Sequence, residues 1–387
     1  MSGITNGLGV LAATPEASAA SATGRVETPV AYDAVILAGF GGPEGQDDVI
    51  PFLRNVTRGR GIPDERLEEV AHHYRHFGGV SPINDQNRAL LAALRAELAA
   101  RGVDLPVYWG NRNWAPYLAD TLRKAHADGH RTLLGLATSA YSSYSSCRQY
   151  REDFARALDE TGLGEGAEAL RIDKVRQYFD HPGFVQPFVD GVRAALAELV
   201  ERGFADDAIR VLFATHSIPT EDSDRSGPDG GAYPAQHRAV AQAVMAGSAA
   251  VGWELVYQSR SGPPTQPWLE PDVNDVLAGL PARGIGAVVI VPLGFVSDHM
   301  EVLWDLDTEA METAAEHGIV ALRTPTPGVD PVYVAGLVDL ILERVHGTPA
   351  AERPAETPLG PWYDVCRPGC CENVRLGFKP AIAGVAP

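Results

Sequence analysis

Residues 286–307 read GAVVIVPLGFVSDHMEVLWDLD, and this stretch holds the two signals around which the chain is organised. The apolar, β-branched run Gly286–Pro292 predicts a short buried strand. The acidic part that follows has carboxylates three and four residues apart, so a helix would align them on one face: Asp298, Glu301, Asp305 and Glu309. Like charges aligned in this way repel one another. Such a stripe either faces water, as a solvated helix surface does, or is used by cations.

Further apolar runs alternate with long amphipathic stretches in both halves of the chain. The runs that predict strands are Ala34–Gly39, Pro106–Gly110, Thr132–Ala137, Leu170–Val175, Ile209–Thr215, Glu254–Ser259, Ala287–Pro292 and Val320–Arg323. The stretches that predict helices include Gln86–Ala100, Ala115–Ala127, Phe184–Arg202, Pro234–Met245 and Pro331–Val345. This alternation predicts parallel sheets with right-handed crossovers and helices on both faces. With four strands in each half, the expected fold is α/β, with two Rossmann-like domains and a cleft between them.

The composition along the chain predicts four segments. Residues 1–30 are rich in Ala, Ser, Thr and Gly, and we expect a disordered N-terminal tail there. The N-terminal Rossmann-like domain is expected at 31–165 and the C-terminal one at 166–347, with its last helix packing back on the first domain. Pro-rich residues then lead into a C-terminal extension, 348–387, that carries cysteines.

Charge and hydropathy exclude several classes of protein. The formal net charge of −18 disfavours nucleic-acid binding, which needs basic patches, and weakly disfavours anionic membrane surfaces. No apolar run approaches the roughly 20 residues that span a bilayer. The N-terminus has no basic start followed by an apolar core, so no secretory signal is predicted. We therefore expect a cytoplasmic protein, in which thiols stay reduced.

Ligands of α/β proteins bind at the carboxyl ends of the strands. Four predicted strands end in loops of unusual content: Gly39–Glu44, Thr138–Cys147, Thr215–Pro219 and the acidic segment from Ser297 onward. The glycine-rich loop lacks the Gly-x-Gly-x-x-Gly spacing and the Lys-Ser/Thr of a P-loop, and Pro43 interrupts the helix start. Nucleotide binding is therefore disfavoured. A loop that lets a large planar ligand approach the backbone fits better.

His216 and Glu301 are the side chains best placed for chemistry. The His216 ring could cap the local backbone, accept a proton or bind a metal. A hydrolase using Ser217 is disfavoured, because the chain contains no Gly-x-Ser-x-Gly elbow. Glu301 belongs either to a solvated helix face or to a site that attracts divalent cations and passes protons. Its position just after a strand, with His299 and Trp304 interleaved, favours the second interpretation.

The chain has only four cysteines, Cys147 and the compact group Cys366, Cys370 and Cys371. Two disulfides are possible by number, but a reducing compartment disfavours them and adjacent cysteines bridge each other only with strain. Four thiolates suit zinc or an iron–sulfur cluster. The pattern favours a metal centre over free thiols and leaves the metal open.

Four segments together resemble the signature segments of ferrochelatases: Phe77–Pro82, Thr215–Pro219, Gln258–Pro263 with Pro267-Trp268-Leu269, and Ser297–Glu301. The resemblance runs in the family's order from about Tyr32 to Val345. It implies two Rossmann-like, chelatase-like domains and the insertion of Fe²⁺ into a porphyrin. It also implies that His216 and Glu301 face each other at the metal-insertion site, and that Asp305 and Glu309 form a hydrated path for the incoming cation.

The resemblance assigns further residues to the porphyrin. Ser81 and Tyr150 match positions that hold a propionate, and Trp268 is expected to pack against the cleft. Phe40 stands where some bacterial relatives have a tyrosine that ligates the metal axially, which a phenyl ring cannot do. Asn113 stands where some relatives have a histidine and receives no metal role.

The four cysteines resemble those of ferrochelatases that carry a [2Fe–2S] cluster, in the actinobacterial arrangement of one body thiol and three tail thiols. The resemblance implies that the cluster is structural or sensory, and that it ties the tail to the body when it is assembled. It also implies coproporphyrin III as the substrate rather than protoporphyrin IX, because Glu221–Ala232 is short and polar where membrane-associated relatives insert an apolar lip.

Four other hypotheses remain at this point. One is a ferrochelatase that uses protoporphyrin IX, and another is a related chelatase that inserts cobalt or nickel into another tetrapyrrole. A third is a non-enzymatic haem-binding or haem-delivery protein on the same fold, and the fourth is that the cysteines hold zinc. Neighbouring enzymes of the haem pathway are the expected protein partners.

Overall fold

The computed structural model describes residues 11–59, 61–248, 250–263, 265–367, 369–372 and 379–384. Within these ranges the chain forms two four-stranded, wholly parallel sheets. The first contains β1 (Ala34–Gly39), β2 (Val107–Asn111), β3 (Thr132–Ala137) and β4 (Arg171–Lys174). The second contains β5 (Ile209–His216), β6 (Gly252–Gln258), β7 (Ala287–Val291) and β8 (Val320–Arg323). The predicted α/β class is confirmed, and each expected strand is present.

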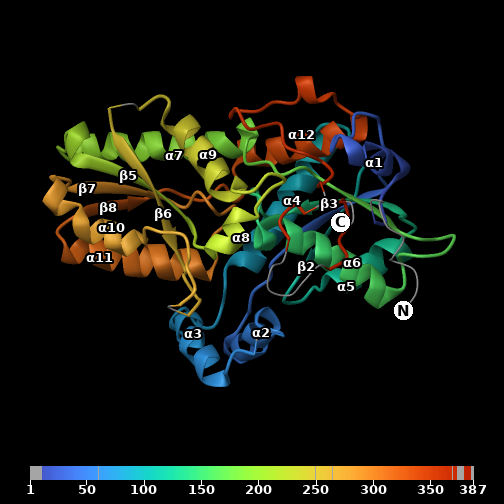
Figure 1. Cartoon of the computed structure of the whole chain (residues 1–387), viewed down its shortest axis with the longest axis horizontal. Coiled ribbons are helices and arrows are strands. Elements are labelled where there is room, and N and C mark those ends of the chain that lie inside the picture. Colours follow the sequence, from blue (N-terminus) through green and yellow to red (C-terminus); the bar gives the residue numbers. More distant parts are fainter. Residues whose placement is uncertain are drawn as a thin grey trace.

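The two sheets share one topology, with strand orders β2-β1-β3-β4 and β6-β5-β7-β8. The sequence shows no repeat by eye, so this repeat exists in the structure alone. Helices lie on both faces of each sheet, and α2 and α3 form a separate lobe below them (Figure 1). The helices are α1 (Pro15–Ala19), α2 (Val49–Val56), α3 (Asp64–His76), α4 (Ile83–Ala100), α5 (Leu118–Ala127), α6 (Gln149–Thr161), α7 (Pro182–Glu201), α8 (Thr220–Asp224), α9 (Ala232–Met245), α10 (Val273–Gly279), α11 (Met311–Glu316) and α12 (Pro331–His346).

Strand β7 shows why the opening stretch of sequence folds as it does. All five of its residues are buried, as expected for an inner parallel strand that is covered on both faces. Because side chains alternate along a strand, Val289 and Val291 join one core cluster while Val288 and Ile290 join another. The first cluster also holds residues of α4, α7, α9 and α12, so it runs past both sheets.

Helix α12 lies against both α4 of the first domain and α7 of the second. Asp330 caps its start by accepting from the amide of Val332 at 2.8 Å, and Gly347 ends it in the left-handed conformation. A Cβ on Gly183 of α7 would lie 2.7 Å from the Cα of Gly336, so only glycines allow α7 and α12 to approach so closely.

One expected domain boundary is wrong, and so is the expected disorder of residues 11–30. Strand β4 pairs with β3, so the first sheet extends past residue 165, where we placed the end of the first domain. Residues 11–30 are ordered rather than disordered: α1 forms there, and Ala17 and Val26 are 1% and 0% exposed. A segment of small, polar residues is disordered when it has nothing to pack against. Here residues 11–30 pack against the rest of the chain. Residues 1–10 lie outside the described residues.

In the described ranges, none of the helices combines the length and the apolarity that crossing a bilayer requires.

Candidate active site

The topology brings His216 and Glu301 together. The chain crosses from β6 on one side of β5 to β7 on the other, so β5 and β7 flank the point where the strand order reverses. Ligands of open α/β sheets bind at such switch points. His216 is the last residue of β5, and Glu301 precedes the π-helical segment Val302–Ala310 that follows β7.

His216 and Glu301 form an ion pair with 3.5 Å between Nε2 and Oε1. Their side chains are 32% and 45% exposed, so the pair is open to a ligand. Burial by itself lowers the pKa of His216, but the Glu301 carboxylate outweighs it and raises that pKa to about 9. Burial likewise raises the pKa of Glu301, yet the His216 charge holds it down at about 2. At neutral pH the substrate-free pair is therefore an imidazolium and a carboxylate.

The His216 ring is held by its own loop. Its Nδ1 hydrogen-bonds the carbonyl of Ser217, and the hydroxyl of Tyr233 donates to the His216 carbonyl at 2.9 Å. With Nδ1 engaged in this way, Nε2 is the nitrogen that faces Glu301.

Asp305 lies one turn beyond Glu301 and is positioned by the end of β6. Gln258 is 1% exposed, pairs in register with His216, and donates from Nε2 to the Glu301 carbonyl at 2.9 Å. The Ser259 hydroxyl donates to Asp305, and Ser259 adopts φ +61°, a conformation that side-chain-bearing residues rarely take. Burial and then the Glu301 charge raise the pKa of Asp305 to about 7, against the Ser259 hydroxyl, which lowers it.

The expected stripe of four carboxylates is only partly present. Glu301, Asp305 and Glu309 remain, with Glu309 exposed at the outer end. Asp298 is not a member: it precedes the helical segment and pairs with Arg323 at 3.2 Å. The helix that we expected to align these residues is π-helical over Val302–Ala310, a form that occurs mostly in short pieces and often at functional sites.

Helix α3 contributes residues that the sequence interpretation missed. The ring of His73 stacks on Trp304 with 4.1 Å between centroids and 8° between planes. Burial, and then the charges of Glu301 and Asp305, raise the pKa of Tyr74. The only signal in the sequence was that Tyr74 lies just before the Phe77–Pro82 segment.

The residues assigned to the porphyrin fall into three places. Phe40 and Tyr150 are linked by Arg112, whose guanidinium lies 5.7 Å from the Phe40 centroid and 4.1 Å from the Tyr150 centroid. Ser81 is buried against the glycine-rich loop, where its amide donates to the carbonyl of Pro43 at 2.9 Å. Trp268 lies in the second domain, where it forms a backbone bridge with Pro219.

Arg112 was not predicted. It is 6% exposed and pairs with Asp153, and its Nη2 is buried without a hydrogen-bond partner. It follows β2 at the carboxyl end of the first sheet, which was the one signal that could have identified it.

The four cysteines gather into one buried cluster, each 6% exposed or less, and none forms a disulfide. The Sγ atom of Cys371 lies 3.8 Å from those of both Cys147 and Cys370. Cys371 also bonds to the second domain: its amide donates to the Arg225 carbonyl at 3.2 Å, and the Gly227 amide donates to its Sγ at 3.1 Å.

Cations surround these thiols. Arg151 lies one turn after Cys147 on α6 and is 3% exposed, and its Nη1 is buried without a hydrogen-bond partner. Lys174 is also buried, and both residues line a small cavity beside Cys147. In the part of the chain that the structure describes, no group of three or more His, Cys, Asp or Glu side chains is spaced as a metal-ion site.

The fold is chelatase-like. The structure of SirB from Bacillus subtilis with Fe³⁺ superposes with a TM-score of 0.50 at 11% identity, covering 84% of this chain and 100% of that one. Residues 32–345 match the family model described as Ferrochelatase, and the chain belongs to the ferrochelatase family.

Similar curated proteins are found in actinobacteria. The coproporphyrin III ferrochelatase of Leifsonia xyli subsp. xyli is 67% identical over 98% of this chain and 100% of its own length. The proteins of the same name from Tropheryma whipplei (strain Twist) and Streptomyces griseus are each 57% identical over 92% of this chain, and over 93% and 97% of their own lengths.

Proposed function

We propose that this protein inserts Fe(II) into coproporphyrin III, with His216 and Glu301 at the metal-insertion site. The observation that carries the proposal is their ion pair at the switch point of the second sheet. The family of the chain and the names of its relatives support the same reaction. Iron insertion replaces two pyrrole protons by one divalent cation, so the site needs a proton acceptor and an anionic group beside the macrocycle.

The pair can supply both functions in turn. In the substrate-free enzyme His216 is protonated and cannot accept a proton. A divalent cation that approaches Glu301 competes with the imidazolium for the same carboxylate and so lowers the pKa of His216. The imidazolium then releases its proton to solvent, and the neutral imidazole accepts the two pyrrole protons one after the other, passing the first to solvent before it takes the second. The approach of iron to Glu301 thus converts His216 into the form that can accept a proton.

The polar segment after His216 supports coproporphyrin III as the substrate. Residues 220–231 form α8 and a turn closed by bonds from Ser226 and Gly231 to the Ser223 carbonyl, at 3.0 and 3.2 Å. This segment offers no apolar surface to a membrane. A porphyrin with four propionates is the more water-soluble substrate and needs no such surface.

Anaerobic Fe(II) insertion, followed by absorbance with coproporphyrin III and with protoporphyrin IX, tests this function. We expect coproporphyrin III to be metallated with the higher kcat/KM. A preference for protoporphyrin IX would overturn the substrate, and faster Co(II) insertion into sirohydrochlorin would favour a different chelatase. Binding of haem without metallation of any porphyrin would identify a haem-delivery protein instead.

We predict that Asp305 controls the response to iron. The Asp305→Asn variant should raise the KM for Fe(II) roughly tenfold and change kcat less, because a neutral amide does not attract the cation. In the unchanged enzyme 1/KM should rise with pH through about 7, because the carboxyl is neutral below that value and charged above it. The groups that face Asp305 and shape this titration are Glu301, Ser259, His216, Glu309, Tyr74 and Gln258.

Ser259→Ala separates this explanation from a loss of structure. The hydroxyl lowers the pKa of Asp305, so its removal should move the rise in 1/KM to higher pH while the plateau stays near the original value. Initial rates over a grid of Fe(II) concentration and pH measure both effects. An unchanged pH midpoint in Ser259→Ala, or an unchanged KM in Asp305→Asn, would contradict the prediction.

We further propose that the four cysteines hold a [2Fe–2S] cluster. The four thiols lie in one buried group, in which the Sγ atoms of Cys147 and Cys370 each lie 3.8 Å from that of Cys371, and these four thiolates would hold the two irons of the cluster. The unpartnered Nη1 of Arg151 and the buried Lys174 fit a group with net negative charge. When bound, the cluster would supply a redox-active centre and would join the tail to the π-helical segment Tyr144–Arg148, which precedes α6, through metal–thiolate bonds.

Cys147→Ser tests the ligand set. The purified protein should contain equal amounts of iron and inorganic sulfide and absorb visible light through thiolate-to-iron charge transfer. The variant should lose that absorbance, whereas Ser145→Ala, two residues away in the same π-helical segment, should keep it. Zinc with no visible absorbance would establish the zinc alternative. Reduced thiols of this kind lead us to propose a cytoplasmic location.

A further inference from the structure

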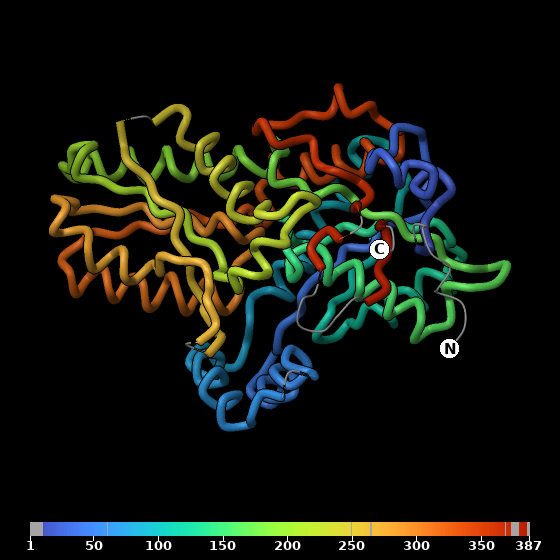
Figure 2. The backbone as a smooth tube through the Cα atoms, viewed as in Figure 1, coloured from blue at the N-terminus to red at the C-terminus, as the bar shows by residue number. Residues whose placement is uncertain are grey.

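Two segments that lie outside the family-matched residues 32–345 pack against each other. The N-terminal segment 11–30 runs beside the C-terminal extension on the first-domain side of the molecule (Figure 2). Leu11 forms a parallel bridge with Ile382, and the amides of Asp364 and Val365 donate to the Gly24 carbonyl at 2.8 and 3.0 Å. The extension therefore contacts the N-terminal segment both before and after its cysteine group, at residues 364–365 and at residue 382.

The N-terminal segment is itself anchored to the body. The Thr14 hydroxyl donates to Oδ2 of Asp173 at 2.7 Å, and the Thr14 amide donates to Oδ1 at 3.1 Å. Thr14 also caps α1 by accepting from the Ala17 amide. The Ile172 amide donates to the Ala12 carbonyl at 2.6 Å, which joins the segment to the edge strand β4.

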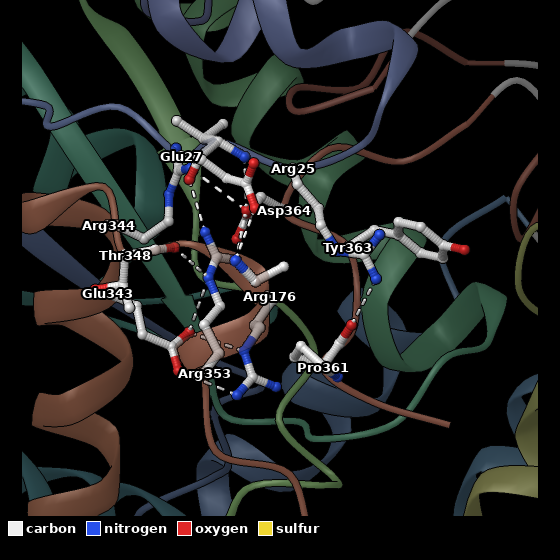
Figure 3. Close-up of polar contacts among 12 residues, drawn as sticks. Arg25, Glu27, Arg176, Glu343, Arg344, Thr348, Arg353, Pro361, Tyr363 and Asp364 are labelled. Carbon is white, nitrogen blue, oxygen red and sulfur yellow. Dashed lines mark hydrogen bonds and ion pairs between the residues drawn. The ribbon is translucent and has the colours of Figure 1, made fainter. Parts of the chain in front are cut away.

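The extension grips one residue of the N-terminal segment from both sides. Asp364 accepts from the Val26 amide at 2.9 Å, and Arg353, which lies beside Asp364 in Figure 3, donates to the Val26 carbonyl at 2.6 Å. Arg353 and Asp364 also pair with each other at 2.8 Å, with both side chains 0% exposed. Charge-assisted bonds in such a dry setting are strong, and losing one partner leaves a buried charge unpaired.

This grip lies next to the cysteines. Asp364 precedes Cys366 by two residues, and the Cys366 amide donates to the Ala383 carbonyl at 2.9 Å. Arg25 reinforces the approach, because it donates to the Pro361 carbonyl at 3.1 Å and lies over the ring of Tyr363. The backbone on both sides of the thiol group is thus fixed by bonds that involve no metal.

We propose that residues 11–30 act as a clasp that keeps the cysteine-bearing extension on the body and the four thiols together whether or not a cluster is bound. The sequence suggested that the cluster itself ties down the tail. The contacts indicate that the N-terminal segment holds the extension on the body, so the cluster would bind at a site in which the thiols are already together. The clasp extends the cluster proposal, but its first test does not depend on it.

The test measures how fast the four cysteines react with a thiol reagent in protein from which iron has been stripped. In the full chain the thiols should react slowly, because all four are buried. A chain that starts at residue 31 should react roughly tenfold faster or more, since exposure then needs only local opening. Asp364→Asn, which keeps the segment but weakens the grip, should fall between them. Asp190→Asn, on an exposed helix face, should match the full chain.

The outcomes separate the clasp from the cluster. Equal thiol reactivity in the full and shortened chains would overturn the clasp. If the shortened chain does not fold, as judged by circular dichroism and iron insertion, Asp364→Asn and Thr14→Val decide the question in the same assay. In protein purified with iron and sulfide, the clasp variants should also lose visible absorbance faster in a chelator. Protein without iron or sulfide would overturn the cluster alone, because the thiol assay still tests the clasp.

Discussion

Replacing Glu301 with Gln should reduce the rate of Fe(II) insertion by ~10³-fold, as expected for a group that takes part in proton and charge transfer. The amide keeps the shape of the side chain but removes the negative charge that attracts iron and holds the His216 proton. The pKa of His216 should then fall from about 9 towards its ordinary value, because Glu301 is the main cause of its rise. We therefore expect the variant to have a neutral histidine and still to insert iron slowly, because a proton acceptor without the carboxylate does not attract the cation.

Two measurements decide this prediction. Steady-state insertion gives the loss in kcat, and NMR titration of the histidines gives the pKa of His216. Glu312→Gln, an exposed change on α11, is the matched control and should leave both unchanged. If Glu301→Gln inserted iron at the original rate, Glu301 would have no role in the reaction. If the pKa of His216 did not change, the ion pair would not be the cause of its high pKa.

Replacing Arg344 with Met should lower the free energy of unfolding by about 3–5 kcal/mol, the usual effect of removing one partner of a buried ion pair. Arg344 is 1% exposed on α12 and donates to Asp173 at 2.9 Å and to the Tyr32 hydroxyl at 2.7 Å. Asp173 also accepts from Thr14, so one carboxylate joins β4, α12 and the N-terminal segment. Without Arg344 this carboxylate remains buried with no cation beside it.

Urea unfolding at constant pH measures the effect. Arg344→Lys, which keeps the charge but loses the planar fork, should lose less stability. Arg193→Met removes an exposed pair with Asp190 and should change stability by no more than about 0.5 kcal/mol. An Arg344→Met protein as stable as the original would mean that the network contributes specificity rather than stability.

The cysteine site lies where three parts of the chain meet. Cys147 belongs to the first domain, the other thiols belong to the extension, and Arg225 and Gly227 of the second domain bond to Cys371. The loop that holds Arg225 continues from His216 through α8. The backbone from His216 to Arg225 therefore links the thiols to the His216–Glu301 pair along the chain.

Local patterns in the sequence were enough to predict the sheets. Short β-branched runs such as Ala287–Val291 have few other ways to bury themselves, so each expected strand is present. His216 and Glu301 were also within reach, because strand ends are recognisable and ligands bind there. Ser259 and Arg112 were not, because a positive φ or an unpartnered guanidinium has no signature in the composition.

The apolar run and the acidic segment of residues 286–307 by themselves determined that a strand delivers Glu301 and Asp305 to one edge of a parallel sheet. The sequence also determined the family, through its signature segments. Only the tertiary structure decided which carboxylates act together: Asp298 pairs with Arg323, whereas Asp305 is held by Ser259. It also decided that residues 11–30 are ordered. Both results depend on contacts between residues that are far apart in the chain. A carboxylate's charge, and whether residues 11–30 are ordered, are set by the partner beside which each is buried and not by residue type alone.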